Sequence, residues 1–436
     1  MYFLYNIILA IAALLLLPYY LLRMLLTGKY RKSLGQKFGL IPPGSITVMR
    51  GSPRIWIHAV SVGEVTAAAP VVVNLRSRLP GACIVLSTST ETGREMAEKM
   101  ITEATAMVYF PLDIPFVVRK VIALVKPDVF AMIETELWPN FIRACHKRSV
   151  KIVLVNGRIS PRSFRRYAMT RFFWMPVLDK IDVAGVISDT DARRLIDLGL
   201  SPSRIHVFGN AKYDSFAAKA SPDLQKMISE KLDIRTGEKV LVAGSTHDGE
   251  EQVILSVYKK LLNVYPDFKL ISVPRHPERA QAVAVMAQKE GLEDIIMMSE
   301  INGGKRRTTE KVIIVDVIGE LFRIYSLAAM VYCGGSLVPK GGQNILEPAA
   351  WGKVVFFGPH MEDFQDEKTL LEASGAGITI RDGNELFERM VRLIQDQTVL
   401  AALEEKGREV IIANKGAAEK YTGLIMQSLS HKASQG

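Results

Sequence analysis

Three acidic side chains follow apolar runs of the sequence and are candidates for proton-transfer chemistry. Glu64 comes after the apolar run in IHAVSVGEV, and Glu134 and Glu136 come after Val129–Ile133. If Arg54–Val60 is a strand and Glu64 opens the next helix, the positive end of the helix dipole favours an ionised carboxylate. Glu64 would then accept a proton; the alternative is an ordinary glutamate that stabilises a helix start. Glu134 or Glu136 would orient an acceptor hydroxyl or pair with nearby arginines.

Basic and amide side chains in the C-terminal half follow other apolar runs and suit a phosphate or a ribose. Pro274 and Arg275 come after the run Lys269–Val273. The forked arginine side chain is suited to clasp a phosphate, and the proline stiffens the backbone before it. Asn344 and Glu347 are three positions apart, so in a helix they share one face. There Glu347 would accept hydrogen bonds from both hydroxyls of a ribose.

A third motif follows the run Val312–Val315 and is expected to begin a helix. Its residues are Val317, Ile318, Gly319, Glu320 and Leu321. Free N–H groups at such a start receive an anion or a base edge. Gly334 and Gly335, after another run, let the backbone approach a ligand closely.

The sequence gives no sign of a resident metal or cofactor. It contains neither GxGxxG nor GxxxxGK[ST], which argues against a dinucleotide cofactor or a P-loop hydrolase. The three cysteines are scattered, and the seven histidines lack the spacing of a zinc site. We therefore expect no metal site and no cofactor.

The stretch from Arg158 to Pro176 mixes five arginines with five aromatic residues. Arginines and aromatic rings suit nucleic acid, but beside a membrane anchor we prefer a surface that contacts lipid headgroups or the phosphates of a lipid acceptor. A plain basic helix is the other alternative. The arginines assigned to this acceptor or membrane surface are Arg158, Arg162, Arg165 and Arg166.

The N-terminus predicts attachment to a membrane. Tyr2–Leu22 carries no charge and has about the length that crosses a bilayer. Arg23, Lys29, Arg31, Lys32 and Lys37 follow, and this basic flank predicts that the rest of the chain stays on the cytoplasmic side. The alternative is a helix that lies on the membrane surface. A formal net charge of +10 suits an anionic lipid surface.

The rest of the 436-residue chain predicts two α/β blocks of parallel strands and crossover helices. The expected strands of the first block are Arg54–Val60, Cys83–Thr88, Ala106–Phe110, Val129–Ile133, Lys151–Asn156, Val183–Ser188 and Ile205–Phe208. Those of the second block are Lys239–Ala243, Lys269–Val273, Val312–Val315, Met330–Cys333, Val354–Phe357 and Gly377–Ile380. In such sheets ligands bind beyond the carboxyl ends of the strands, where all the motifs above occur.

These patterns predict two Rossmann-like domains that face a central cleft, preceded by a membrane-anchoring helix. The expected segments are an anchor at 1–26, a first Rossmann-like domain at 27–208, a linker at 209–237, a second Rossmann-like domain at 238–397 and a helical segment at 398–436 that packs back on the first domain.

Nine motifs together resemble the bacterial 3-deoxy-D-manno-octulosonic acid (Kdo) transferases of lipopolysaccharide synthesis, glycosyltransferase family 30. They are HAVSVGE, TETGRE, ETELWPN, NGRIS, GNAKYD, GSTHDGEE, PRHPER, IGEL and GGQNILEPAAWGK, and they span essentially the full chain. The resemblance implies a GT-B fold and metal-independent, inverting transfer of Kdo from CMP-Kdo to the lipid A precursor lipid IVA, at the inner face of the inner membrane. One departure is Gln343, where the family commonly has histidine.

The resemblance also implies roles for single residues. Glu64 would be the general base, and Arg275 would hold the phosphate of CMP. Asn344 and Glu347 would lie at the ribose. The cytidine would be lined by Ile318, Gly319, Glu320 and Leu321.

Two other functions are compatible with parts of the sequence. One is another GT-B enzyme, a UDP-sugar transferase or epimerase, which a preference for UDP over CMP would reveal. The other is a non-catalytic membrane-bound protein that binds lipid or nucleic acid, for which the basic aromatic stretch is the main support. Against nucleic acid as a partner stands the better fit of that stretch to lipid.

Overall fold

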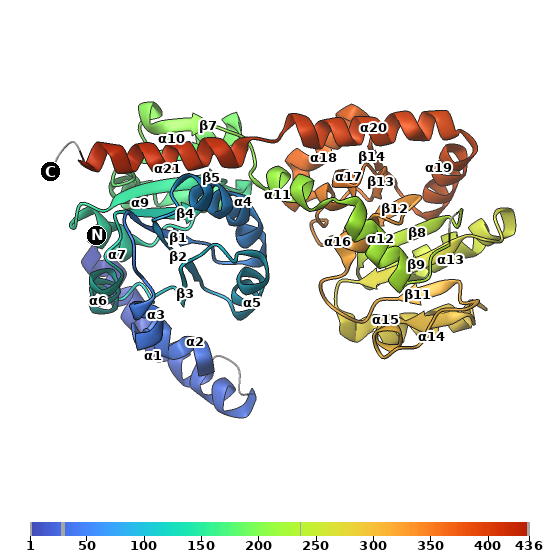
Figure 1. Ribbon diagram of the computed structural model, residues 1–436, viewed down its shortest axis with the longest axis horizontal. Helices are drawn as coiled ribbons and strands as arrows, with labels where there is room; N and C mark the ends of the chain where they lie inside the picture. Colours follow the sequence, from blue (N-terminus) through green and yellow to red (C-terminus); the bar gives the residue numbers. More distant parts are fainter. Residues whose placement is uncertain (1, 28–30, 236, 434–436) are drawn as a thin grey trace. The chain divides into compact units, whose positions relative to one another are not determined.

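The structure is a computed structural model that describes residues 2–27, 31–235 and 237–433 (Figure 1). The chain forms two compact units. Unit 1 comprises Met1–Ser215 and Lys415–Gly436, and unit 2 comprises Phe216–Asn414. The boundary at residue 215 falls within the stretch 209–237 that we expected to be a linker. The described residues of that stretch hold α11 (Lys212–Lys219) and α12 (Pro222–Lys231) and no strand.

Unit 1 contains a seven-stranded parallel sheet. Its strands are β1 (Arg54–His58), β2 (Cys83–Thr88), β3 (Ala106–Tyr109), β4 (Val129–Ile133), β5 (Lys151–Gly157), β6 (Val183–Val186) and β7 (Ile205–Val207). They lie in the order β3-β2-β1-β4-β5-β6-β7. All seven were predicted from their apolar runs. Most of them are buried on both faces of the sheet, whereas the edge strand β7 is largely exposed.

Unit 2 contains a second seven-stranded parallel sheet. Its strands are β8 (Val240–Thr246), β9 (Lys269–Pro274), β10 (Ile295–Met297), β11 (Val312–Ile314), β12 (Met330–Cys333), β13 (Val355–Phe357) and β14 (Gly377–Thr379). They lie in the order β10-β11-β9-β8-β12-β13-β14. The edge strand β10 was not predicted, because its apolar run continues directly into the helix that begins at Met298, so the sequence does not separate the two.

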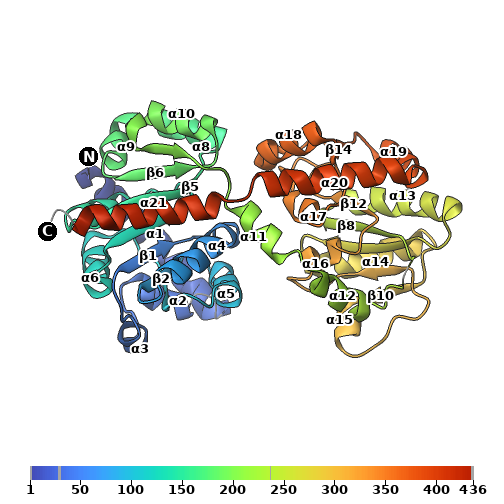
Figure 2. The same ribbon diagram turned by 45° about the horizontal axis from the view of Figure 1, so that its top comes forward.

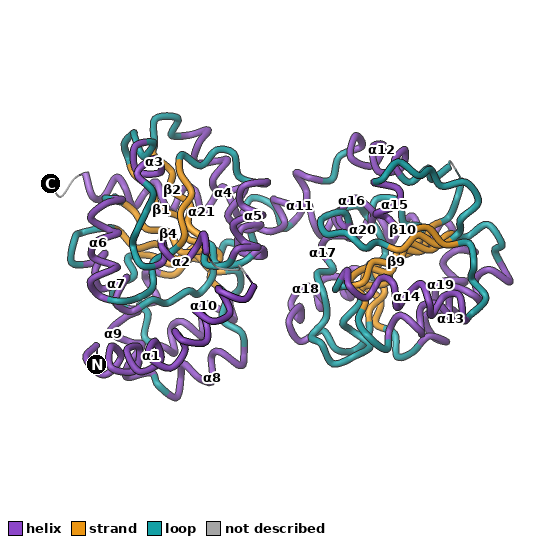
Figure 3. Tube along the Cα trace, turned by 90° about the horizontal axis from the view of Figure 1, so that it is seen from below, coloured by secondary structure: helices purple, strands orange, loops and turns teal. Residues whose placement is uncertain are grey.

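Helices cover both faces of each sheet (Figure 3). Those of unit 1 are α1 (Tyr2–Thr27), α2 (Arg31–Lys37), α3 (Pro43–Thr47), α4 (Val62–Arg78), α5 (Glu91–Met100), α6 (Pro115–Val125), α7 (Pro139–His146), α8 (Pro161–Met169), α9 (Arg171–Leu178), α10 (Asp189–Leu198) and α21 (Ala417–Ala433), with a 3₁₀ turn at Pro202–Arg204. The C-terminal helix α21 lies along α4 and β5 (Figures 1 and 2). Its Tyr421 hydroxyl donates to the carbonyl of Gly209 at 2.8 Å.

The remaining helices belong to unit 2. They are α12, α13 (Glu250–Val264), α14 (Ala280–Lys289), α15 (Met298–Asn302), α16 (Leu321–Tyr325), α17 (Leu346–Ala350), α18 (Gln365–Ser374), α19 (Gly383–Gln395) and α20 (Gln397–Ala413), with 3₁₀ turns at Pro277–Arg279 and Glu362–Phe364. Side-chain caps fix many helix starts in both units. The capping residues are Thr90, Ser160, Ser188, Ser221, Asp382 and Asp396.

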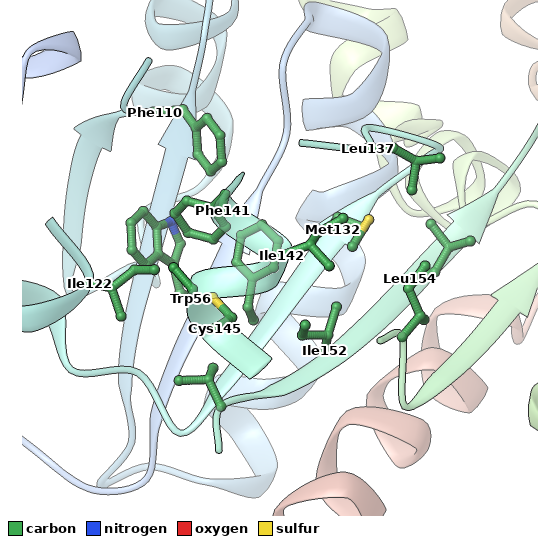
Figure 4. Close-up of a cluster of buried hydrophobic side chains, with 14 of the residues drawn as sticks. Trp56, Phe110, Ile122, Met132, Leu137, Phe141, Ile142, Cys145, Ile152 and Leu154 are labelled. Atoms are coloured by element: carbon green, nitrogen blue, oxygen red, sulfur yellow. The ribbon is translucent and has the colours of Figure 1, made fainter. Parts of the chain in front are cut away.

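The alternation of side chains along β1 builds two cores in unit 1. Trp56 points to one face of the sheet, and Ile55 and Ile57 point to the other. On the first face Trp56 packs edge-on against Phe141, with ring centroids 5.1 Å apart, near Phe110 (Figure 4). Both cores bury most of the side chains of the strands, so we expect the polar groups of a functional site at the strand ends.

The strand orders place a topological switch point in each sheet. In unit 1 the chain winds outward from β1 in one direction and from β4 in the other, and in unit 2 the corresponding neighbours are β8 and β12. Loops that follow such neighbours diverge and leave a crevice beyond the carboxyl ends of the strands. We therefore expect the functional side chains of each unit there.

The N-terminal helix α1 is held on unit 1 by polar contacts. The Tyr5 hydroxyl donates to Oδ2 of Asp113 at 2.9 Å. Nδ2 of Asn140 donates to Oδ1 of Asn6 at 2.7 Å. The guanidinium carbon of Arg143 lies 4.5 Å from the centroid of the Tyr2 ring. These contacts anchor one face of α1 on α7 and on the loop before α6.

The predicted membrane-spanning anchor is not found. A helix does cover the predicted stretch, but among the described residues no helix is long and apolar enough to cross a membrane. Of the predicted basic flank, the side chains of Arg23, Lys29, Arg31 and Lys32 lie outside the described residues. Lys37 is described, and its Nζ lies 6.0 Å from the centroid of the Tyr109 ring.

Candidate active site

Two predicted carboxylates lie at the switch point of unit 1. β1 leads through Val60 into α4, whose first turn carries Glu64, and β4 is followed directly by Glu134. Because β1 and β4 pair in parallel, both acids lie at the same edge of the sheet. Glu134 has a φ of 59°, a left-handed conformation that is costly for a residue with a side chain. Such strain persists where the surrounding structure enforces it, often at functional sites.

Both oxygens of Glu64 bond to the start of its own helix. Oε2 accepts from the N–H of Val60 at 2.6 Å, and Oε1 accepts from the Ser61 hydroxyl at 2.9 Å. The residue is only 6% exposed. This is the helix-start arrangement that the sequence left open as an alternative. It leaves acceptor capacity free, because a carboxylate has about four lone-pair positions.

The protonation state of Glu64 differs from the one expected. Burial raises the pKa of Glu64 to about 8, and the negative charges of Glu134 and Glu136 add to the rise. Hydrogen bonds from Val60 and Ser61 lower this pKa by less. The sequence suggested that the helix dipole keeps the carboxylate ionised. That expectation is wrong at neutral pH, since desolvation and like charge outweigh the dipole.

A cation that the sequence analysis missed lies in this site. Nζ of Lys212 lies 2.9 Å from Oε1 of Glu134. Lys212 begins α11, and the loop before it is fixed because the N–H of Ala211 donates to Oδ1 of Asn156 at 2.9 Å. The motif GNAKYD contains this lysine, but nothing in the spacing shows that it meets an acid 78 positions away.

The four predicted arginines lie beyond β5 of unit 1. The carbonyl of Arg158 accepts from the Thr135 hydroxyl at 2.7 Å, which ties the loops after β4 and β5 together. Arg162, Arg165 and Arg166 lie on α8 and, with Pro161, line a hollow of about 480 Å³. Three of the four therefore gather at one basic hollow, while Arg158 precedes it in the chain.

In unit 2 the predicted phosphate and ribose residues are neighbours. Pro274 ends β9, and Arg275 follows it with an exposed side chain. Nδ2 of Asn344 donates to Oε1 of Glu347 at 3.2 Å. The two residues do not share a helix face as expected, because Asn344 precedes α17, which begins at Leu346. Burial raises the pKa of Glu347 to about 7, against the Asn344 hydrogen bond and the positive charges of Lys219 and Arg275. Arg275 thus lies within electrostatic reach of the Asn344–Glu347 pair.

The motif after β11 forms a shorter helix than expected. The helix begins at Leu321, not at Val317, and covers five residues. Gly319 has a φ of 98°, which breaks the helical path before it. Ile318 is 85% exposed, and its apolar side chain is free to cover a planar group. The carboxylate of Glu320 is held by Lys231 at 3.0 Å and by Arg323 at 3.3 Å.

The N–H groups of the glycine loop after β12 are turned toward the interior of unit 2. The N–H groups of Gly335, Ser336 and Leu337 all donate to the buried carboxylate of Glu250, at 2.7 to 3.0 Å. Gly334 is required for a different reason, since a Cβ there would lie 2.4 Å from the carbonyl oxygen of Ser245. In this loop the glycines serve backbone packing and the contact with Glu250.

Comparison with known proteins decides the family. A profile of the 3-deoxy-D-manno-octulosonic-acid transferases (kdotransferases) matches residues 32–215. The 3-deoxy-D-manno-octulosonic acid transferase of Haemophilus influenzae is 32% identical over 432 residues, which is 97% of each chain. This chain belongs to the Kdo transferases. It is therefore a glycosyltransferase that transfers Kdo in lipopolysaccharide biosynthesis.

Two solved structures are similar to this Kdo transferase. The C-terminal CMP-Kdo binding domain of WaaA from Acinetobacter baumannii is 26% identical, covers 45% of this chain and 98% of that chain, and has a TM-score of 0.40. The UDP-GlcNAc 2-epimerase of Neisseria meningitidis bound to UDP-GlcNAc is 13% identical, covers 87% of this chain and 100% of that chain, and has a TM-score of 0.60. The second likeness shows that the fold, with its parallel-sheet α/β domains, is shared beyond the transferases.

The Kdo transferase thus carries a different chemistry at each switch point. Unit 1 brings together Glu64, Glu134 and Lys212, a set that can exchange a proton and hold a hydroxyl. Unit 2 brings together Arg275, Asn344 and Glu347, a set that can hold a phosphate and a ribose. Among the described residues, no group of three or more acidic, histidine or cysteine side chains is arranged to hold a metal ion.

Proposed function

We propose that this Kdo transferase moves Kdo from CMP-Kdo to the lipid A precursor lipid IVA, with inversion at the anomeric carbon and with Glu64 as the general base. The observation that carries the proposal is the identity of 32% with a Kdo transferase over 97% of both chains. The placement of the candidate side chains at the two switch points supports it.

The proposed step moves one proton and exchanges one bond. The acceptor hydroxyl attacks the anomeric carbon of Kdo and gives its proton to the ionised carboxylate of Glu64. The bond from that carbon to the phosphate oxygen breaks, and CMP leaves with the negative charge. Arg275 stabilises that charge, and such fixed charges commonly supply a large part of the rate enhancement. Glu134 orients the acceptor hydroxyl through its negatively charged carboxylate.

The donor site follows from the contacts in unit 2. We assign the phosphate to Pro274 and Arg275 and the ribose to Asn344 and Glu347. The cytidine is assigned to the turn before α16, whose residues are Ile318, Gly319, Glu320 and Leu321. The exposed side chain of Ile318 and the absence of a side chain at Gly319 leave room for a flat base to lie against this turn. No metal is assigned to this step, because a single phosphate can be neutralised by arginine.

A second part of the proposal concerns the membrane. One face of α1 is fixed to unit 1, and the other exposes the apolar residues Phe3, Leu4, Ile7, Ile8, Ile11, Leu14 and Leu15. The ring of Tyr5 lies 5.7 Å from that of Phe173 in α9, so α9 adjoins α1. Helix α9 exposes Phe172 and Met175 in turn. A helix that is polar toward its own domain and apolar outward suits the interface of a bilayer.

We therefore propose that unit 1 rests on the cytoplasmic face of the inner membrane, with α1 lying on the surface. The basic hollow of Arg162, Arg165 and Arg166, with Arg158 before it, would then meet the phosphates of lipid IVA. A lipid partner, and not nucleic acid, fits the apolar surface beside these arginines.

Product analysis tests the transfer. Purified enzyme is incubated with CMP-Kdo and lipid IVA, and the lipid products are weighed by mass spectrometry. A mass increase of one or more Kdo residues is the expected result. In parallel, calorimetry compares binding of CMP and UDP. Tighter binding of UDP, or no Kdo-bearing lipid, would contradict the proposal.

Vesicle flotation tests the membrane surface. With anionic vesicles we expect the double variant Leu15→Ser, Phe172→Ser to float several-fold less than the unaltered enzyme. Ile412→Ser is the matched control, because Ile412 in unit 2 is similarly exposed at 63%. Equal flotation of all three proteins would rule out this surface.

A further inference from the structure

A buried carboxylate in unit 2 organises the switch point without being among the predicted site residues. Glu250 is fully buried at the first position of α13, which begins shortly after β8. Its Oε2 accepts from the N–H groups of His247 at 2.9 Å and Gly335 at 2.7 Å. The first belongs to the loop after β8 and the second to the loop after β12. One carboxyl oxygen therefore joins the two loops that define the switch point.

The other oxygen of Glu250 fixes the course of the second loop. Oε1 accepts from the Tyr332 hydroxyl at 2.6 Å, from Ser336 N–H at 3.0 Å and from Leu337 N–H at 2.9 Å. Five hydrogen bonds thus converge on one carboxylate, and hydrogen bonds to a charged group are stronger than neutral ones. The helix start of α13 adds a favourable dipole.

The same network reaches a third loop. The hydroxyl of Ser336 donates to the carbonyl of Cys333 at 2.6 Å and accepts from the N–H of Gly358 at 2.8 Å. Gly358 follows β13, and a Cβ at that position would lie 2.2 Å from the carbonyl oxygen of Ser336. The loops after β8, β12 and β13 are therefore held in one arrangement around Glu250.

This arrangement determines which backbone and side-chain groups of the loops remain free to bind the donor. The N–H groups of residues 335–337 point at Glu250, so they do not bind an anion. What the loops offer instead is side chains, His247 on the first and Lys340 and Asn344 on the second. The His247 ring lies edge-on to that of His276, with centroids 5.8 Å apart. Its Nε2 is shielded from solvent and has no hydrogen-bond partner among the described residues.

We infer that Glu250 is a positioning residue for the donor site: it holds the loops after β8 and β12 so that their side chains meet the nucleotide-sugar, and it does not contact the donor itself. This inference rests on the proposed function, because it takes the donor to be CMP-Kdo. It predicts a selective effect. Loss of the carboxylate weakens donor binding and leaves acceptor binding in unit 1 unchanged.

Glu250→Gln is the direct test, because glutamine keeps the shape but turns an amide N–H₂ toward backbone donors. We expect the Kd for CMP, by calorimetry, and the KM for CMP-Kdo to rise on the order of tenfold. The KM for lipid IVA should stay within about twofold of its value in the unaltered enzyme, since a loss of donor binding changes the KM of the donor and not that of the acceptor. Tyr332→Phe removes a single hydrogen bond to Oε1 and should raise the donor KM about two- to threefold.

Glu238→Gln is the matched control for a loss of stability alone. Glu238 accepts from Arg307 at 2.7 Å and pairs with Lys269 at 3.5 Å, ahead of β8 in the same unit. We expect this variant to lower the unfolding temperature while CMP binds as in the unaltered enzyme.

The outcomes separate the inference from the proposed function. Unchanged CMP binding and donor KM in a folded Glu250→Gln protein would overturn the inference, and so would an equal loss in Glu238→Gln. If Glu250→Gln does not fold, Tyr332→Phe decides, and an unchanged donor KM in it is the overturning result. An unaltered enzyme that binds UDP and not CMP would instead overturn the proposed function.

Discussion

Lys212 and Glu134 form an ion pair of 2.9 Å beside the buried carboxylate of Glu64. The pair joins the loop after β4 to the start of α11. The negative charge of Glu134 is one of the causes that raise the pKa of Glu64. Because Lys212 places a positive charge against Glu134, we expect it to offset that charge and to moderate the proton affinity of the proposed base.

Replacing Lys212 by methionine tests this dependence. Without the ammonium group the charge of Glu134 is no longer offset, and the pKa of Glu64 should rise further. We expect the rising limb of the pH profile of kcat/KM to move upward by ~1 pH unit. Lys226→Met is the control, because Lys226 is exposed and pairs only loosely with Glu230, at 3.9 Å. A limb that stays in place in Lys212→Met would show that the ion pair does not tune the base.

The pH profile of the unaltered enzyme is a prediction in itself. The pKa of Glu64 is raised to about 8, so in the free enzyme at pH 7 most molecules carry a proton on the carboxyl that must accept one. kcat/KM should therefore rise with pH through 7 and level off above about 8, since this quantity reports the free enzyme. Initial rates with both CMP-Kdo and lipid IVA well below their KM values, measured from pH 6 to pH 9, give this rising limb for the free enzyme. A profile that is already flat at pH 6 would contradict the assignment of Glu64.

Glu64→Gln should remove the chemical step and leave donor binding intact. General-base catalysis contributes ~10²–10⁴-fold, so kcat should fall by about that factor. Because the donor residues belong to unit 2, calorimetry should give an unchanged Kd for CMP. Near-normal transfer by purified Glu64→Gln, weighed as Kdo-bearing lipid, would refute the role of the base.

The same substitution should change stability with a defined sign. The folded pKa of Glu64, about 8, lies above its ordinary value of 4.5. Between these values the native state holds a proton that the unfolded chain has lost, so this group lowers the free energy of unfolding as pH rises. Glu64→Gln has no such proton, and its advantage over the unaltered enzyme should grow from pH 5 to pH 8 by on the order of 3–4 kcal/mol.

Thermal unfolding at several pH values measures that difference. Glu98→Gln serves as the control, because Glu98 is exposed and pairs with Arg94 on the surface of α5, where an ion pair contributes little. An advantage of Glu64→Gln that is constant from pH 5 to pH 8 would show that the carboxyl is not held protonated.

Much of the fold could be read from the sequence because its physical signals are local. Buried parallel strands are near-continuous apolar runs, and each run from Arg54 to Gly377 that reads this way is a strand. The exception is Ile295–Met297, which pairs with Val312–Ile314. Its apolar run continues into the helix Met298–Asn302 without a break, so the local pattern does not mark a separate strand.

The candidate site was predictable only where it follows the strands directly. Glu134 and Arg275 were found because each comes just after an apolar run. Lys212 and Glu250 were not, since their importance comes from partners 78 and about 80 positions away. The protonation of Glu64 was also beyond the sequence, because burial of its side chain is a property of tertiary packing.

The docking of α1 gives a last prediction, with a matched pair of tyrosines. The Tyr5 hydroxyl donates to Asp113, whose carboxylate also accepts from the N–H groups of Asn140 and Phe141. The Tyr2 hydroxyl has no hydrogen-bond partner among the described residues. Tyr5→Phe should therefore loosen α1, because a hydrogen bond to a charged group contributes ~1.5–3 kcal/mol. Hydrogen exchange of the α1 amides should become roughly tenfold faster or more. Tyr2→Phe should leave exchange unchanged, since the ring that Arg143 covers is kept. Equal exchange in both variants would show that Asp113 does not hold the helix.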